Sequence, residues 1–286
     1  MARDPFLCDP PHAIHFSGGR TSGYMLRRHL DAHGGILPAG VEVIFCNTGK
    51  ERSETLEFVE RCSLEWGVNV VWLEYRYRPG CEPVHGFEVV NYATASRNGK
   101  PFEQVIQARN FLPNVVARFC TVEMKIRTAQ RYLVSLGWEG WTSSIGLRAD
   151  EPARVSRLRG TNRHSREDPT APLATAGISL AEVREFWGSQ PFDLGLDSYQ
   201  GNCDLCFLKG RTKIERIMRE RPDLAQWWID QEEKIKTNAS ARNASFRADR
   251  PKYHQMLKQV QEQPLLPFGE VVDDEPLIDC VCGDEG

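Results

Sequence analysis

The stretch from His15 to Leu26, "HFSGGRTSGYML", places a Ser-Gly-Gly turn between an apolar run and a helical pattern. Its two glycines cost backbone entropy and are useful where the backbone must approach another group closely. Backbone N–H groups in such a turn bind phosphate together with the amino end of the following helix. A tight turn without a ligand is the alternative. The predicted phosphate site consists of Ser17, Gly18, Gly19, Arg20, Thr21 and Ser22.

Nine cysteines form the second set of residues that could do chemistry. The amino end lacks a signal segment, so we expect a cytoplasmic protein without disulfides. The segment "NCDLC" holds Cys203 and Cys206, and two intervening residues allow both thiolates to bind one metal or one cluster. The tail "DCVCGDEG" adds Cys280 and Cys282. We interpret the isolated cysteines as buried or incidental thiols: Cys8, Cys46, Cys62 and Cys81.

Strand and helix patterns alternate in the first half of the chain. Apolar runs predict strands at residues 12–17, 41–49, 68–76 and 140–149. Amphipathic stretches predict helices at residues 21–34, 52–67 and 121–137. Residues 78–115 lack periodicity and are interpreted as a loop-rich insertion. The order implies a Rossmann-like, doubly wound parallel α/β sheet of about five strands, with the phosphate turn at its carboxyl edge.

The second half is predicted to be helical. Ser179 and Glu182 have the offset of a capping box, and a helix pair over 211–235 is broken at Pro222. We expect an α/β nucleotide domain over 1–175, a helical region with the Cys-x-x-Cys pair over 176–263, and an acidic tail over 264–286.

Charge and hydropathy narrow the classes of partner. A net charge of −3 argues against a general nucleic-acid binder, and no run reaches the ~18 apolar residues of a membrane span. Six arginines between Arg148 and Arg166 form a basic stripe beside the expected phosphate site. The stripe indicates either an anionic substrate or a solvated charged face.

The segment "SGGRTS" resembles the PP-loop of the ATP pyrophosphatases, an adenine nucleotide alpha-hydrolase-like superfamily. Further segments resemble its phosphoadenylyl-sulfate (PAPS) reductase branch, in the family's order. These are "NTGKERSETLEFV" (47–59), "CTVEMKI" (120–126), "GLRADEPAR" (146–154) and, as in cluster-bearing members, "NCDLCFLKG" (202–210).

The chain departs from the family pattern at three places. Arg20 and Thr21 stand where many ATP-splitting loops have Lys and Asp. Gly19 is kept, whereas true sulfonucleotide reductases usually lose this second glycine. The tail shares only Cys-Gly with the reductases' catalytic E-C-G-[IL]-H motif.

The resemblance implies that ATP, or a related adenine nucleotide, binds with Mg²⁺ and reacts at its α-phosphate. Cations would stabilise the leaving pyrophosphate. The candidates are Arg20, Lys50, Lys125 and Arg148, of which Lys125 and Arg148 are the predicted catalytic pair. Contacts to the nucleotide are also expected from Asn47, Thr48, Gly49 and Lys50.

The resemblance also adds Cys120 to Cys203 and Cys206 as metal ligands. Three thiolates would leave one iron of a [4Fe–4S] cluster open, unless Cys280 or Cys282 is the fourth ligand. A structural zinc bound by the same three cysteines and one tail cysteine is the rival.

Three functions follow from these motifs. The first is an ATP-dependent enzyme of sulfur transfer that uses the cluster, and the arginine stripe suits a nucleic-acid acceptor. The second is a strict PAPS reductase in which a tail thiol, Cys282 or Cys280, attacks the sulfate sulfur. The third is a non-enzymatic nucleotide or nucleic-acid-binding protein with structural zinc. A sulfur- or electron-donor protein and the oligomeric state stay open.

Overall fold

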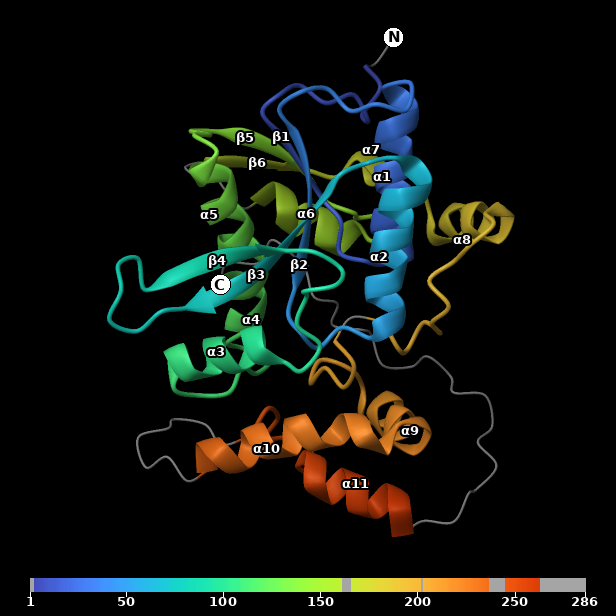
Figure 1. The fold of residues 1–286 in the computed structure, drawn as a ribbon. Helices are drawn as coiled ribbons and strands as arrows, with labels where there is room; N and C mark the ends of the chain where they lie inside the picture. The colour runs from blue at the N-terminus through green and yellow to red at the C-terminus, as the bar shows by residue number, and fades with distance from the viewer. Residues whose placement is uncertain (1–2, 161–165, 202, 237–244, 263–286) are drawn as a thin grey trace.

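The chain folds around a six-stranded sheet in the computed structural model, which describes residues 3–160, 166–201, 203–236 and 245–262 (Figure 1). The strands lie in the order β4-β3-β2-β1-β5-β6, and all neighbours are parallel except β3 and β4. Their bounds are β1 His12–His15, β2 Val41–Asn47, β3 Val70–Tyr77, β4 His85–Val90, β5 Trp141–Ser144 and β6 Glu167–Thr170. This arrangement confirms the predicted Rossmann-like α/β class.

Helices cover both faces of the sheet (Figure 1). Those before β5 are α1 Arg20–Ala32, α2 Ser53–Trp66, α3 Lys100–Arg109, α4 Phe119–Thr121 and α5 Arg127–Ser135, with a π-helical turn, η1 Val122–Ile126, between the last two. Those after it are α6 Pro152–Gly160, α7 Pro172–Thr175, α8 Leu180–Ser189, α9 Arg211–Glu220, the 3₁₀ turn η2 Pro222–Leu224, α10 Ala225–Lys236 and α11 Tyr253–Glu262.

Alternate residues of the central strands face two different helix layers, because successive side chains of a strand point to opposite faces. Ile14 and Phe45 pack in one core with side chains of α1, α2 and α8. Ala13 and Ile44 pack on the other face against Ala129 and Leu133 of α5. Both faces are therefore buried, as expected of a parallel sheet.

A third core lies beyond the carboxyl edge of the sheet, where α9, α10 and α11 gather at the bottom of Figure 1. Trp228, Phe246 and Tyr253 are almost completely buried in it. Cys120, Cys203, Cys206 and residues of α3 belong to the same core, which links the helical region to the sheet.

Four predicted strands, the capping box of Ser179 and the break at Pro222 are confirmed. The loop-rich insertion predicted over 78–115 also contains one strand and one helix, β4 and α3. The N-cap of α1 is Gly19. Within the described residues, no helix combines the length and the apolar character that a membrane crossing requires.

Candidate functional site at the carboxyl edge

The two glycines after β1 have different physical reasons to be there. Gly18 has a φ of +78°, and a Cβ on it would lie 2.7 Å from Thr55 Cγ2 on α2. The fold itself therefore requires Gly18. Gly19 has a φ of −106°, and the nearest atom to its Cβ would be Ser17 Oγ at 3.9 Å. Packing does not require Gly19, and the space above its backbone is open.

Backbone donors of the loop converge on one hydroxyl. Ser22 Oγ accepts hydrogen bonds from Ser17 N at 3.2 Å and Gly19 N at 3.3 Å, and it lies 2.9 Å from Ser17 Oγ. Two N–H groups and two hydroxyls thus meet at the first turn of α1, where the helix dipole favours negative charge. A bound phosphate would replace the Ser22 hydroxyl as the acceptor of these N–H groups.

The loop opens into a cavity of about 810 Å³ bounded by the segment after β5 and by α8. Gly146 lets that segment approach closely, since its Cβ would lie 3.3 Å from Ser22 Cα. The loops after β1 and β5 are neighbours where the strand order reverses, which is where ligands bind in open α/β sheets. Four arginines line this cavity: Arg20, Arg148, Arg154 and Arg184.

Arg148 reaches the loop as predicted. Its Nη1 donates to Thr21 Oγ1 at 3.1 Å, and Asp150 and Glu151 hold the guanidinium at 2.9 and 3.3 Å. Arg20 is held differently, because it forms an ion pair with Asp193 and donates to Leu196 O at 2.9 Å. A contact between Arg20 and a phosphate stays a prediction.

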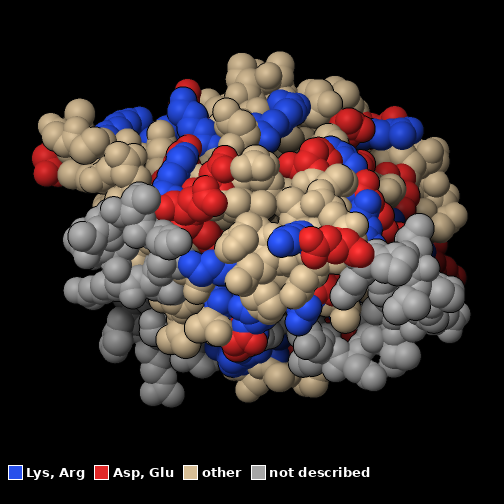
Figure 2. All heavy atoms as spheres, turned by 90° about the horizontal axis from the view of Figure 1, so that it is seen from below, with Lys and Arg blue, Asp and Glu red and all other residues tan. Residues whose placement is uncertain are grey.

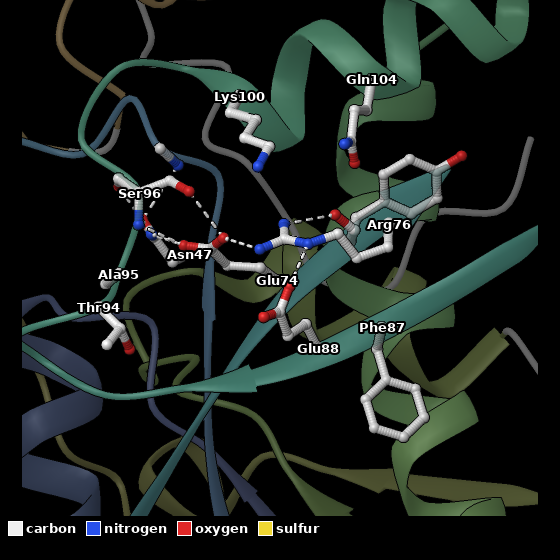
Figure 3. Close-up of polar contacts among 12 residues, drawn as sticks. Asn47, Glu74, Arg76, Phe87, Glu88, Thr94, Ala95, Ser96, Lys100 and Gln104 are labelled. Carbon is white, nitrogen blue, oxygen red and sulfur yellow. Dashed lines mark hydrogen bonds and ion pairs between the residues drawn. The ribbon is translucent and has the colours of Figure 1, made fainter. Parts of the chain in front are cut away.

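The turn after β2 is tied to the protein interior (Figure 3). Asn47 Nδ2 donates to Glu74 Oε1 at 2.6 Å and to Ser96 O at 2.9 Å, and Asn47 Oδ1 accepts from Gly49 N at 3.0 Å. Glu74 is fully buried and also binds Arg76 at 2.7 Å. The structure therefore gives the Asn47 side chain a structural role, and Glu74 is a partner that the sequence analysis missed.

Lys50 lies away from the phosphate loop and contacts the Cys-x-x-Cys segment. Its Nζ is 2.8 Å from Asp204 Oδ2, and both side chains are less than a tenth exposed. Asp204 also accepts from Trp228 Nε1 at 2.8 Å, and its N–H donates to Lys50 O at 2.8 Å. The sequence analysis missed both partners, although a charged residue between two candidate ligands is a usable signal.

Thr48 and Glu51 extend the same connection to a cysteine. Thr48 Oγ1 lies 3.4 Å from Cys203 Sγ, and Glu51 forms an antiparallel bridge with Cys203. Residues 48–51 and the segment carrying Cys203 therefore form one packed unit beside the sheet edge.

The three predicted metal ligands Cys120, Cys203 and Cys206 are buried in the same core. Among the described residues, their sulfurs are not all within 4.8 Å of one another. Thiolates on one zinc, with Zn–S of about 2.3 Å in a tetrahedron, lie within about 4 Å of each other. Cubane thiolates each bind a different iron and stand farther apart, so the cluster and the zinc site both stay predictions for these three cysteines.

The segment after Cys120 forms the π-helical turn that carries Glu123 and Lys125. Such turns are rare and occur often at functional sites. Lys125 is half-buried, and its carbonyl accepts a contact from Cys46 Sγ at 3.5 Å. The predicted tail residues Cys280 and Cys282 lie outside the described residues.

Glu123, on the same turn, is a buried carboxylate shared by three arginines. Arg127 and Arg131 contact it at 2.7 and 3.1 Å, and Arg109 pairs with it as well. Burial would raise the pKa of Glu123, but the arginines outweigh it and hold the pKa below its usual value. Glu123 is therefore ionised at neutral pH.

One Cys/His group at the opposite, amino edge was not predicted. The ligand atoms of Cys8, His12 and His29 lie within 4.8 Å of one another. Cys8 Sγ is 3.3 Å from His29 Nδ1, which also lies 2.7 Å from Phe6 O. Burial raises the pKa of Cys8 to about 12, so this thiol is neutral at physiological pH. The group is a buried hydrogen-bonded cluster far along the sheet from the phosphate loop.

Comparison with known proteins gives one relative in sequence. The chain is 29% identical over 217 residues to an uncharacterized nin region protein, ORF290, of Escherichia phage lambda, covering 74% of this chain and 71% of that protein. No family model matches the chain.

Several solved structures are similar to the chain at a low level, including the following two. One is phosphoadenylyl-sulfate (PAPS) reductase from Candida auris in a phosphate complex, with a TM-score of 0.40, 15% identity, and coverage of 66% of this chain and 80% of that chain. The other is the U34-tRNA thiolase NcsA from Methanococcus maripaludis with its [4Fe-4S] cluster, with a TM-score of 0.41, 12% identity, and coverage of 91% and 73%. At such low TM-scores neither similarity identifies a function.

Proposed function

We propose that this protein is a PP-loop enzyme that binds ATP through its phosphates and acts in sulfur transfer with a cysteine-bound iron–sulfur cluster. The observation that supports it most is the pair Gly18 and Gly19. Packing explains the first glycine, whereas the second stands at the N-cap of α1 with open space above its backbone. A ligand that needs this approach is a phosphate, because the loop N–H groups already converge there.

The basic cavity suits the charge that develops on a leaving pyrophosphate. Preorganised donors and cations stabilise such charge without reorganisation at the moment of reaction. Arg148 lies at the loop and can act in this way, and Mg²⁺ would supply further positive charge beside the phosphates. Lys125, on the π-helical turn, is the second proposed catalytic cation.

The sulfur chemistry is assigned to the core that contains Cys120, Cys203 and Cys206. A cluster with three protein ligands supplies an open iron that can carry a sulfur atom. The chain's own contribution is to hold the thiolates in a buried site and to join it to the nucleotide side through Thr48 and Lys50. A nucleic acid remains the acceptor that we propose.

Product analysis tests this function. With ATP, an acceptor RNA and a sulfide source, the enzyme should release pyrophosphate, and Gly19→Val should abolish the release. Gly140→Ala, a glycine change away from the loop, is the matched control and should retain it.

The other outcomes separate the alternatives. Formation of sulfite and adenosine bisphosphate from PAPS, without pyrophosphate release from ATP, would assign strict PAPS reductase activity, which the cysteines of the tail favour. Nucleotide binding without either product, together with one zinc per chain, would assign a non-enzymatic binding protein.

A further inference from the structure

A second cavity, of about 840 Å³, lies on the face of the sheet that α5 covers. Its walls come from β4 and the loop before it, from α5, from Trp141 at the start of β5 and from Arg166 just before β6, and none of its lining residues lines the phosphate-loop cavity. Figure 1 shows α5 and β4 on the opposite side of the central strands from α1 and α2. This groove is therefore separate from the proposed nucleotide site.

The groove is basic. Its described lining residues include no carboxylate and four arginines: Arg78, Arg127, Arg131 and Arg166. On the face seen in Figure 2, by contrast, basic and acidic side chains are interspersed. The chain as a whole has a net charge of −3, so this concentration of positive charge is local.

Two acids lie beside the groove without lining it: Glu123, and Glu167, which accepts a hydrogen bond from the lining residue Gln130 at 3.0 Å. Arg127 and Arg131 share the one carboxylate of Glu123 with Arg109. Within the described ranges, neither Arg78 nor Arg166 forms an ion pair, and Arg78 Nη2 donates only to Phe87 O at 3.2 Å.

The nearest acid on β4 points elsewhere. Phe87 and Glu88 are adjacent in the strand and lie on opposite faces, as Figure 3 shows. Glu88 pairs with Arg76 on the far face, while Phe87 faces α5 and packs edge-on against Tyr132. The groove therefore receives the aromatic ring and not the carboxylate.

Two buried donors at the groove lack acceptors. Trp141 is 6% exposed, and its Nε1 has no hydrogen-bond partner among the described residues. Arg131 Nη1 is likewise buried without a partner there. Buried polar groups are nearly always paired, so an unpaired group calls for an explanation. Because both groups are donors, an acceptor such as a phosphate oxygen or a water molecule would satisfy them.

We infer that this groove binds a single-stranded nucleic-acid segment. Phosphates would contact the arginines, and a base would pack on the half-buried ring of Phe87, which is how strands bind without sequence preference. Arg78, Arg127 and Arg166 come from three separate elements, and this spread matches successive phosphates better than one free nucleotide. The inference is independent of the reaction proposed above.

Fluorescence anisotropy with a labelled single strand of about 12 nucleotides tests the inference. The double variant Arg78→Ala/Arg166→Ala should weaken binding at least about tenfold. The slope of log affinity against log salt concentration should become shallower by about 0.7 for each arginine removed. The control is Arg27→Ala/Arg61→Ala, which removes the same charge from exposed positions on α1 and α2. It should change affinity less than about twofold, because its charges lie away from the groove.

Trp141→Phe tests the unpaired donor without removing the ring. Strand binding should weaken about threefold, while the thermal midpoint of the free protein should stay the same or rise, because an unsatisfied buried N–H is gone. A purely structural tryptophan would instead lower the midpoint and leave binding unchanged.

Three results would overturn the inference. They are equal losses of affinity in the groove and control double variants, no binding even at low salt, and competition by AMP at concentrations equal to those of the oligonucleotide. The last result would assign the groove to a free nucleotide.

Discussion

At the scale of single residues, Gly18 and Gly19 separate what the fold requires from what a ligand requires. A side chain on Gly18 meets Thr55, Phe45 and Val59 and also requires a positive φ. A Cβ on Gly19 would meet only Ser17 Oγ, at an ordinary contact distance of 3.9 Å. Neighbouring glycines can therefore be distinguished by substitution, although they look equivalent in the sequence.

We expect Gly19→Val to lose nucleotide binding while the fold is retained, since its side chain would occupy the space through which a phosphate approaches the backbone and a Val at the N-cap of α1 costs only about 1 kcal/mol. Isothermal titration with ATP and with PAPS measures the first effect, and chemical denaturation measures the second. Gly18→Val is the contrasting change and should destabilise the fold by about 2 kcal/mol or more. Unchanged affinity of the Gly19 variant for both nucleotides would refute the phosphate-loop assignment.

Buried histidines give a pH dependence at the same scale. Burial lowers the pKa of His12 and of His29 to about 4, so both are neutral in the folded protein. The unfolded chain, with a His pKa near 6.5, binds protons first as the pH falls. The free energy of unfolding should therefore decrease below pH 6.5, by about 2 kcal/mol for each histidine at pH 5.

Denaturation curves at pH 7 and pH 5 check this expectation. His12→Gln and His29→Gln should each reduce the change in the free energy of unfolding between pH 7 and pH 5, because glutamine does not titrate. His254, which is exposed, serves as the control, and His254→Gln should leave the slope as it is. A wild-type stability that is equal at the two pH values would contradict the burial argument.

At the scale of elements, the turn after β2 and the Cys-x-x-Cys segment behave as one unit. Lys50 and Asp204 are both buried, and removal of one partner leaves the other charge uncompensated. Asp204→Asn should therefore destabilise the protein by about 3 kcal/mol and weaken metal retention by Cys203 and Cys206. The measurements are guanidinium unfolding and metal content.

An exposed ion pair is the control for this change. Glu103 and Lys234 are paired with about half of each side chain exposed, so Glu103→Gln should change the free energy of unfolding by less than about 1 kcal/mol. Equal effects of the two substitutions would show that burial of the Lys50–Asp204 pair is irrelevant.

Sequence patterns predicted the strands β1, β2, β3 and β5 because their apolar residues are local and continuous. They missed β4, the antiparallel partner of β3, because Gly86 and Glu88 interrupt its apolar pattern. They also missed Asp204 and Glu74, because a buried charge is explained only by a partner far away in the sequence. The site residues were named from motifs, but their partners required the tertiary structure.

At the scale of the whole molecule, the thiols fall into different environments. Cys120, Cys203 and Cys206 share the core between the sheet and the helical region. Cys8 and Cys62 lie in the core beneath α1 and α2, where burial raises the pKa of both. Neutral thiols bind metal poorly, so Cys8 and Cys62 are not expected to bind the cluster.

Anaerobic purification should give a brown protein with about four irons per chain. Cys120→Ala, Cys203→Ala and Cys206→Ala should each lose the colour and the iron, whereas Cys8→Ala and Cys62→Ala should retain both. Absorbance and elemental analysis report the result. A colourless protein with one zinc per chain would refute the cluster.

The short strand β6 has a consequence for self-association. The carbonyls of Arg166 and Thr170 accept hydrogen bonds from Trp141 and Ile145 of the β5 segment, so Pro169 turns its backbone nitrogen to the outer edge. Proline has no N–H to offer a further strand. The ladder cannot be extended regularly on that side, and β4, whose outer edge carries no proline, is left as the border at which another copy of the sheet could add.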